Sequence, residues 1–167
     1  MVHNSIIRAA VVVALAAVLD AVLSPYLSIG WISPKFTIVA VVLAASGLRD
    51  LQAVLLGFFG GILIDALGGG LFGVGAFGGL VAGTLAVRAG GLRRKDTERL
   101  VMAQAVAISV AVYDLIQLAA INLAGLQGPG LGIYLVAGVV PDTLLNAVLA
   151  YLICGWMLRV IRVKEGR

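Results

Sequence analysis

Long apolar stretches, separated only by short polar or basic segments, are the feature that most restricts how this chain folds. Hydrophobic residues make up 62% of the 167 residues and charged residues 12%, whereas soluble domains are about half apolar and a quarter charged. A water-soluble core of this size cannot bury so much apolar surface. The chain is therefore predicted to be an all-α integral membrane protein, and at ~20 residues per span it has room for six transmembrane helices in a single polytopic domain.

The predicted spans follow the apolar stretches. They cover about residues 6–27, 34–48, 51–67, 71–87, 100–124 and 133–158, with a basic loop at 88–99 and a basic tail at 159–167. The first stretch is longer than the core of a signal peptide and contains Asp20, so we expect it to be retained as a span. The last contains Pro141, which predicts a kink or a loosened helix backbone.

The basic residues predict the orientation of the bundle. With six spans, all of them except Lys35 fall on one side: Arg8, Arg49, Arg88, Arg93, Arg94, Lys95, Arg99, Arg159, Arg162, Lys164 and Arg167. The positive-inside rule then places both termini in the cytoplasm. The net charge of +4 therefore reflects topology rather than nucleic-acid binding. The loop residues Arg93, Arg94, Lys95 and Arg99 either serve this topology alone or also bind anionic lipid or a cytoplasmic protein.

Glycines recur every four residues on both sides of the triplet at 68–70. One predicted helix carries Gly57, Gly61 and Asp65 on a single face, and the next carries Gly75, Gly79 and Gly83. Such spacing lets two helix backbones approach closely in lipid, and the glycine triplet lets the chain fold back on itself. We therefore predict a tight helical hairpin with Asp65 near its turn. The alternative is that this spacing is a chance result of the high glycine content.

Several polar side chains lie within the predicted spans. The residues concerned are Asp20, Asp65, Asp114, Gln117, Asp142 and Asn146. Three of the acids, Asp20, Asp114 and Asp142, are expected in the outer half of the bilayer. Lys35 is placed at the outer rim, where we expect it to reach Asp65 as an outer-rim ion pair. Three interpretations remain open: a network that only fixes helix packing, a substrate pocket open to the outside, and a proton or cation relay.

Patterns of soluble enzymes are missing from the sequence. The single histidine, His3, lies at the start of the chain, and no Cys/His metal cluster, phosphate-binding loop with a lysine, or serine nucleophile elbow is present. We therefore expect a protein that is not an enzyme and that needs no cofactor or metal.

Four short segments together resemble the rod-shape-determining protein MreD family. They are SPKFTIV with Pro34 and Phe36, LLGFFGGILIDAL at 55–67 with Gly57, Phe58, Gly61 and Asp65, LFGVGAF at 71–77, and TLLNAVLAY at 143–151 with Asn146. Their order and the length of the chain also match the family. Asp114 and Asp142 are not part of the family pattern.

The resemblance implies a scaffold subunit of the bacterial cell-elongation machinery in the inner membrane. Members of the family pair with the single-span protein MreC and act alongside MreB, RodA and a class-B transpeptidase in lateral peptidoglycan synthesis. Their fold is thought to be similar to that of the substrate-binding subunits of energy-coupling-factor vitamin transporters. Such a transporter subunit is the alternative function, and its outward pocket would use Asp20, Asp114 and Asp142.

Overall fold

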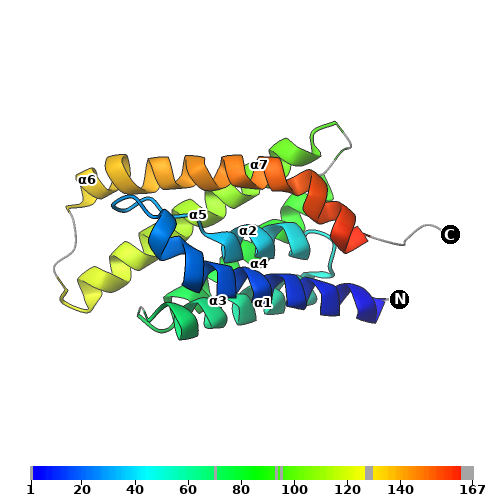
Figure 1. The fold of residues 1–167 in the computed structure, drawn as a ribbon, viewed down its shortest axis with the longest axis horizontal. Helices are drawn as coiled ribbons and strands as arrows, with labels where there is room; N and C mark the ends of the chain where they lie inside the picture. Colours follow the sequence, from blue (N-terminus) through cyan, green and yellow to red (C-terminus); the bar gives the residue numbers. More distant parts are fainter. Residues whose placement is uncertain (1, 70, 93, 95, 127–129, 163–167) are drawn as a thin grey trace.

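The computed structural model describes residues 2–69, 71–92, 94, 96–126 and 130–162. Its elements are α1 (Val2–Leu27), α2 (Phe36–Ala45), α3 (Asp50–Gly68), α4 (Val74–Leu92), α5 (Glu98–Leu123), α6 (Leu131–Tyr134), the π-helix η1 (Leu135–Val139) and α7 (Val140–Arg162). The helices run roughly lengthwise, and the two ends of the described chain lie at the same end of the bundle (Figure 1).

Five helical segments of the described chain are long and apolar enough to cross a membrane. They are Ser5–Leu27, Asp50–Gly68, Val74–Leu92, Glu98–Leu123 and Leu131–Trp156. This architecture agrees with the predicted membrane helical bundle. The second predicted span, residues 34–48, differs from the others because it contains only the ten-residue helix α2. At 1.5 Å per residue such a helix is about 15 Å long, roughly half the thickness of the hydrocarbon core.

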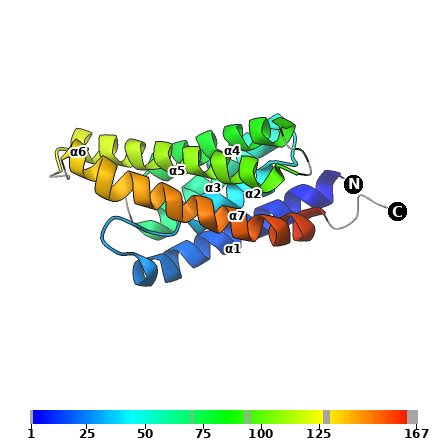
Figure 2. The same ribbon diagram turned by 90° about the horizontal axis from the view of Figure 1, so that it is seen from above.

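The short helix α2 forms the centre of the bundle. Every residue from Thr37 to Ala45 is buried, and α2 contacts α1, α3, α4, α5 and α7. Figures 1 and 2 both show it enclosed by the longer helices. A helix that is apolar all round is expected in such a position, and its β-branched residues Val39, Val41 and Val42 fill the core.

The last crossing is a single long helical segment with an irregular turn. α6, η1 and α7 follow one another without a break (Figure 1), and the π-helical turn ends two residues before Pro141. Proline has no backbone N–H and its ring clashes with the preceding turn, so a widened turn is a common way to accommodate it. The loosened backbone expected from Pro141 is therefore present as a π-helix.

The glycine-rich helices α3 and α4 form a tight antiparallel hairpin. A Cβ atom on Gly57 would overlap the carbonyl group of Gly79, and one on Gly61 would overlap the carbonyl group of Gly75. Farther along, a Cβ atom on Gly83 would overlap the carbonyl group of Ala53. The backbones of the two helices are thus in direct contact at these positions. Gly69 ends α3 with φ 64°, the left-handed conformation that glycine adopts without strain.

We predict that Gly61→Leu lowers the stability of the protein, because the new side chain must push α3 away from the Gly75 backbone. Overpacking of this kind costs about 1–3 kcal/mol or more. The measurement is the temperature at which half of the detergent-purified protein is lost from the monodisperse peak in size-exclusion chromatography. Gly91→Leu is the matched control, because a Cβ at Gly91 would have no described atom within 4 Å apart from its chain neighbours and the backbone of its own helix. Equal midpoints for the two variants would contradict close packing at Gly61.

Candidate functional site

The segment between α1 and α2 has no regular structure beyond a bridge between Ile29 and Ile32, yet it enters the bundle. Its backbone is bound by side chains of α7. Ser33 N donates to Asp142 Oδ1 over 2.8 Å, and Lys35 N donates to Asn146 Oδ1 over 2.7 Å. Asn146 Nδ2 in turn donates to Ser33 O over 3.1 Å. Asp142 and Asn146 are almost fully buried, so they replace the water that would otherwise solvate this backbone.

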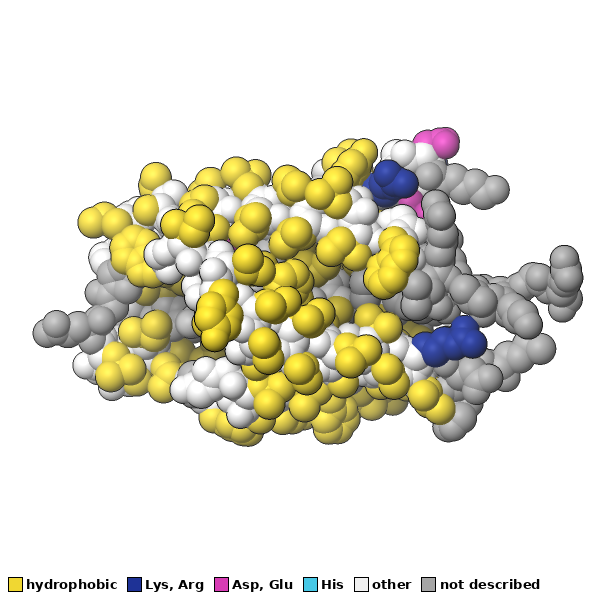
Figure 3. All heavy atoms as spheres, viewed as in Figure 1, with side chains coloured by type: hydrophobic (Ala, Val, Ile, Leu, Met, Phe, Trp, Pro, Cys, Tyr) yellow, Lys and Arg dark blue, Asp and Glu magenta, His cyan; other side chains and the backbone are white. Residues whose placement is uncertain are grey.

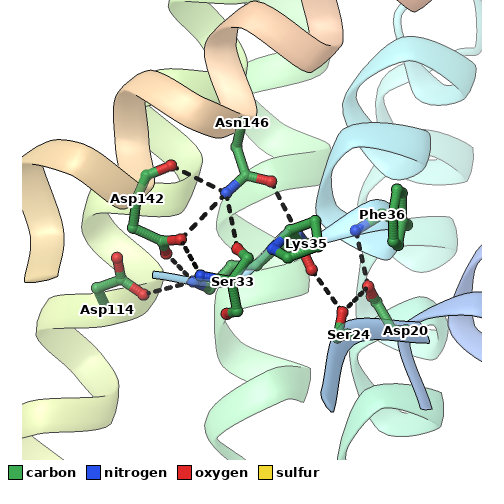
Figure 4. Close-up of polar contacts among 9 residues, drawn as sticks. Asp20, Ser24, Ser33, Lys35, Phe36, Asp114, Asp142 and Asn146 are labelled. Atoms are coloured by element: carbon green, nitrogen blue, oxygen red, sulfur yellow. Dashed lines mark hydrogen bonds and ion pairs between the residues drawn. The ribbon is translucent and has the colours of Figure 1, made fainter. Parts of the chain in front are cut away.

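Lys35 lies at the centre of a buried ion-pair cluster (Figure 4). Its Nζ is 3.0 Å from Asp114 Oδ1 and also contacts Asp142 Oδ2. The Nζ is 5.7 Å from the centre of the Tyr113 ring, which adds a cation–π contact. The side chain of Lys35 is only 12% exposed. The cluster therefore joins α5 and α7 to the start of α2 through one ammonium group.

The predicted outer-rim pair of Lys35 with Asp65 is wrong. Lys35 lies well inside the bundle and binds Asp114 and Asp142 instead. The prediction failed because it placed Lys35 at the outer rim, at the start of a span over residues 34–48, whereas the segment before α2 turns inward and brings Lys35 to the two acids. One signal in the sequence was available: Lys35 is the one basic residue that the positive-inside pattern does not explain.

Asp20 of α1 binds the beginning of α2. Its Oδ1 accepts from Phe36 N over 2.7 Å, and its Oδ2 accepts from Thr37 N over 2.8 Å and from the Thr37 hydroxyl. Ser24, one turn later on α1, donates to Pro34 O over 2.6 Å. The first N–H groups of a helix have no partner within the helix and carry partial positive charge. A carboxylate from a neighbouring helix therefore satisfies the start of α2 deep in the bundle.

Asp65 of α3 has the same role at the start of α4. It accepts hydrogen bonds from Gly73 N, Gly75 N and Ala76 N over 2.8, 2.7 and 3.0 Å. Asp65 lies near the C-terminal end of α3, where the negative end of the helix dipole disfavours a carboxylate. The hairpin removes this problem because it brings the positive end of α4 to the same carboxylate. Asp65 thereby ties the two helices together at their turn.

A cavity of about 520 Å³ lies beside the Lys35 cluster. It is bounded by α1, by the 28–35 segment and by the ends of α3, α5 and α6. Its wall includes Asp20, Trp31, Lys35, Tyr113, Asp114 and Gln117. Of the acids predicted for an outward pocket, the cavity wall includes Asp20 and Asp114 but not Asp142, which contacts Lys35. Among the described residues, no group of three or more His, Cys, Asp or Glu side chains is placed to hold a metal ion.

The aromatic residues of this region were not identified from the sequence as part of a site. The rings of Trp31 and Tyr134 meet edge to face with centroids 5.9 Å apart, and both line the cavity together with Tyr113. The position of Trp31 over the cavity depends on the inward course of the 28–35 segment, which local sequence does not reveal.

The basic loop lies apart from this site. Arg94 and Arg99 are exposed, and Arg99 lies over the ring of Tyr151 at 6.0 Å. Arg93 and Lys95, which were predicted with them, lie outside the described residues. Figure 3 shows an extended apolar surface, with the visible charged side chains at the end where the termini lie. That distribution suits a body surrounded by lipid with one charged end in water.

A bundle of long apolar helices with polar side chains joined in its interior defines a multi-pass α-helical membrane protein. The chain belongs to the rod shape-determining protein MreD family, whose model matches residues 4–164. The resemblance inferred from the sequence is thus confirmed over nearly the whole chain. Membership gives the protein a role in the determination of cell shape. Comparison with curated proteins and with solved structures gave no match.

We predict that Lys35→Met destabilises the protein strongly, because it leaves Asp114 and Asp142 buried without their cation. Breaking a buried ion pair from one side costs about 3–5 kcal/mol. Heating the detergent-purified protein and measuring the surviving monodisperse fraction checks this. Arg94→Met, at an exposed position, is expected to behave like the unaltered protein. Adding Asp114→Asn to Lys35→Met is expected to recover part of the loss, and a Lys35→Met protein as stable as the Arg94→Met control would refute the prediction.

Proposed function

We propose that the chain is a non-enzymatic scaffold subunit of the bacterial cell-elongation complex. In this role it binds MreC, acts alongside RodA, a class-B transpeptidase and MreB, and helps to control lateral peptidoglycan synthesis. The observation that carries the proposal is the match to the MreD family over residues 4–164. The bundle is suited to a scaffold because its interior is held by backbone contacts and capped helix ends: α3 and α4 touch through glycines, and Asp65 binds the start of α4.

Within this proposal the chain is a single polytopic domain that crosses the membrane six times. The second crossing combines the irregular 28–35 segment with the half-length helix α2, and an even number of crossings suits termini at the same end of the bundle (Figure 1). Both termini then lie in the cytoplasm, as the basic residues require. The proposed architecture is similar to that of substrate-binding subunits of energy-coupling-factor transporters. A transporter function of that kind is the alternative, and the comparisons give it no support.

The proposed partner surface is an outward helix face together with the outer rim. Apolar side chains at this rim are strongly exposed, with Tyr26 at 84% and Phe72 at 74%. Aromatic residues are favoured at the membrane interface and at protein contacts, so the rim suits a membrane protein partner.

The test is affinity purification of the tagged chain from its native host in a gentle detergent, followed by mass spectrometry of the co-purifying proteins. Recovery of MreC, with or without RodA and its transpeptidase, would support the scaffold role. Recovery of a transporter-type ATPase pair instead would overturn it.

We predict that Asp65→Ala reduces the amount of MreC recovered in this experiment. Loss of the carboxylate leaves the N–H groups of Gly73, Gly75 and Ala76 without their acceptor and loosens the end of the hairpin. The matched control is Asp96→Ala, because Asp96 lies in the exposed loop before α5. Equal MreC recovery by the two variants, normalised to the amount of bait, would argue against a role of Asp65 in assembly.

The orientation makes a separate prediction. In a Cys154→Ala background, which removes the single native cysteine, a cysteine at Ser28 is expected to react with a membrane-impermeant maleimide in intact spheroplasts. A cysteine at Asp96 is expected to react only after the membrane is opened. Both positions are exposed, so a difference in labelling reports the side of the membrane rather than burial. The reverse pattern would place the termini outside.

A further inference from the structure

The cavity of about 520 Å³ lies towards the end of the bundle opposite the described termini, and the scaffold role makes no use of it (Figure 1). It reaches the surface beside the segment between α1 and α2, where Ser28, Gly30 and Trp31 are exposed and form part of its wall. Its volume lies within the ~300–1,000 Å³ that is usual for small-molecule sites. The cavity can therefore admit a small molecule from outside the bundle.

The charged groups of the cavity wall bind other groups of the protein. Both carboxylate oxygens of Asp20 accept hydrogen bonds from the start of α2. Lys35 and Asp114 bind each other, and Lys35 also contacts Asp142. A charged ligand would lose its hydration on entering the cavity without gaining an ion pair with a described wall residue that has no partner. The wall therefore favours an uncharged ligand.

Uncharged polar side chains on the same wall are open to hydrogen bonding. Tyr113 and Gln117 of α5 and Tyr134 of α6 line the cavity, and all three are partly exposed. None of these side chains donates or accepts a hydrogen bond within the described part of the chain. A phenol hydroxyl and an amide can each both donate and accept. Their natural partner is a molecule whose own groups do both, as hydroxyl groups do.

Aromatic rings form a further part of the wall. Trp31, Tyr113 and Tyr134 all line the cavity, and the rings of Trp31 and Tyr134 meet edge to face. The face of an aromatic ring carries partial negative charge, so it packs well against C–H groups, whose hydrogens carry partial positive charge. A sugar ring combines such C–H faces with hydroxyl groups at its edge and is uncharged. It therefore matches each feature of this wall.

We propose that this cavity binds an uncharged saccharide. Its hydroxyl groups pair with Tyr113, Gln117 and Tyr134, and a C–H face of its ring packs against the aromatic side chains. The site goes beyond the proposed scaffold role and does not rest on it. Two sources share this chemistry: a free sugar in the aqueous phase and the headgroup of a glycolipid.

The experiment uses the full chain with Trp156→Phe in phosphatidylglycerol nanodiscs whose scaffold protein contains no tryptophan. This change leaves Trp31, on the cavity wall, as the single tryptophan of the chain, so its emission reports binding. Lipid replaces maltoside detergents, because their sugar headgroups would compete. The methyl glycosides of glucose, galactose and N-acetylglucosamine test the free source. Monoglucosyl diacylglycerol tests the lipid source, with diacylglycerol as its match.

A saturable change in Trp31 emission with at least one methyl glycoside supports a free sugar. A saturable change with the glycolipid alone, and not with diacylglycerol, supports a lipid headgroup. For a free sugar, the uronide of the responding glycoside, which adds a carboxylate, and sorbitol, which has hydroxyl groups but no ring, are expected to bind at least about tenfold more weakly. No saturable response to any glycoside or to the glycolipid, or equal responses to a ligand and its match, would overturn the proposal.

Gln117→Leu tests the hydrogen bonds of the site. It is expected to raise the half-saturating amount of the responding ligand about threefold to tenfold, because the amide is lost. Gln104→Leu is the matched control, since Gln104 is exposed on the same helix and does not line the cavity. Equal half-saturating amounts in the two variants would count against the proposed site.

A milder variant protects the test against misfolding of Gln117→Leu. Tyr134→Phe removes one hydroxyl from the wall and keeps the ring, so it is expected to weaken binding by a similar factor without disturbing the packing. Tyr151→Phe is its control, because Tyr151 lies beside Arg99 and away from the cavity. Unchanged binding in a monodisperse Tyr134→Phe protein would remove this hydroxyl from the site and contradict the proposed set of contacts.

Discussion

The hydrogen-bonding groups at the buried start of α2 must find partners within the protein, because lipid and apolar side chains offer none. Asp20 binds the first N–H groups of the helix, while Asp142 and Asn146 bind the backbone of the segment before it. These three side chains come from α1 and α7, which are far apart in the sequence. The position of α2 therefore depends on both helices being in place, and the central helix in turn provides the surface against which the rest of the bundle packs.

The same arrangement recurs at the turn of the hairpin formed by α3 and α4. Asp65 on α3 binds the N–H groups of α4, as Asp20 on α1 binds those of α2. In both places a charge that would be costly in an apolar medium is stabilised by the positive end of a neighbouring helix. Both carboxylate oxygens of these acids accept backbone hydrogen bonds, so the acids fix the positions of the helices. Asp114 and Asp142 differ from these two acids because they bind the ammonium group of Lys35. Acids of one type thus fall into two groups by their surroundings: those that bind the start of a helix and those that bind a buried cation.

Much of the arrangement could be predicted from local sequence. Apolar length identified the five long helices, and the four-residue glycine spacing identified the faces that meet in α3 and α4. The family followed from short segments in a characteristic order and was confirmed over residues 4–164. The partner of Lys35 could not be predicted in this way. Whether Lys35 binds Asp65 or the pair Asp114 and Asp142 depends on the path of the non-helical segment 28–35. Such a segment has no sequence periodicity from which its path could be predicted.

The sequence by itself determined that this chain is an α-helical membrane protein and which helix faces contact each other closely, because hydrophobic length and residue spacing are properties of consecutive residues. Tertiary structure decided which carboxylate binds which backbone, the depth of Lys35 and the existence of the cavity beside it. These depend on groups separated by about a hundred residues, such as Ser33 and Asp142, whose N–H and carboxylate meet only after α1, α2 and α7 have come together. Hydrogen bonds and ion pairs act over a few ångströms, so their partners are fixed by the assembled bundle.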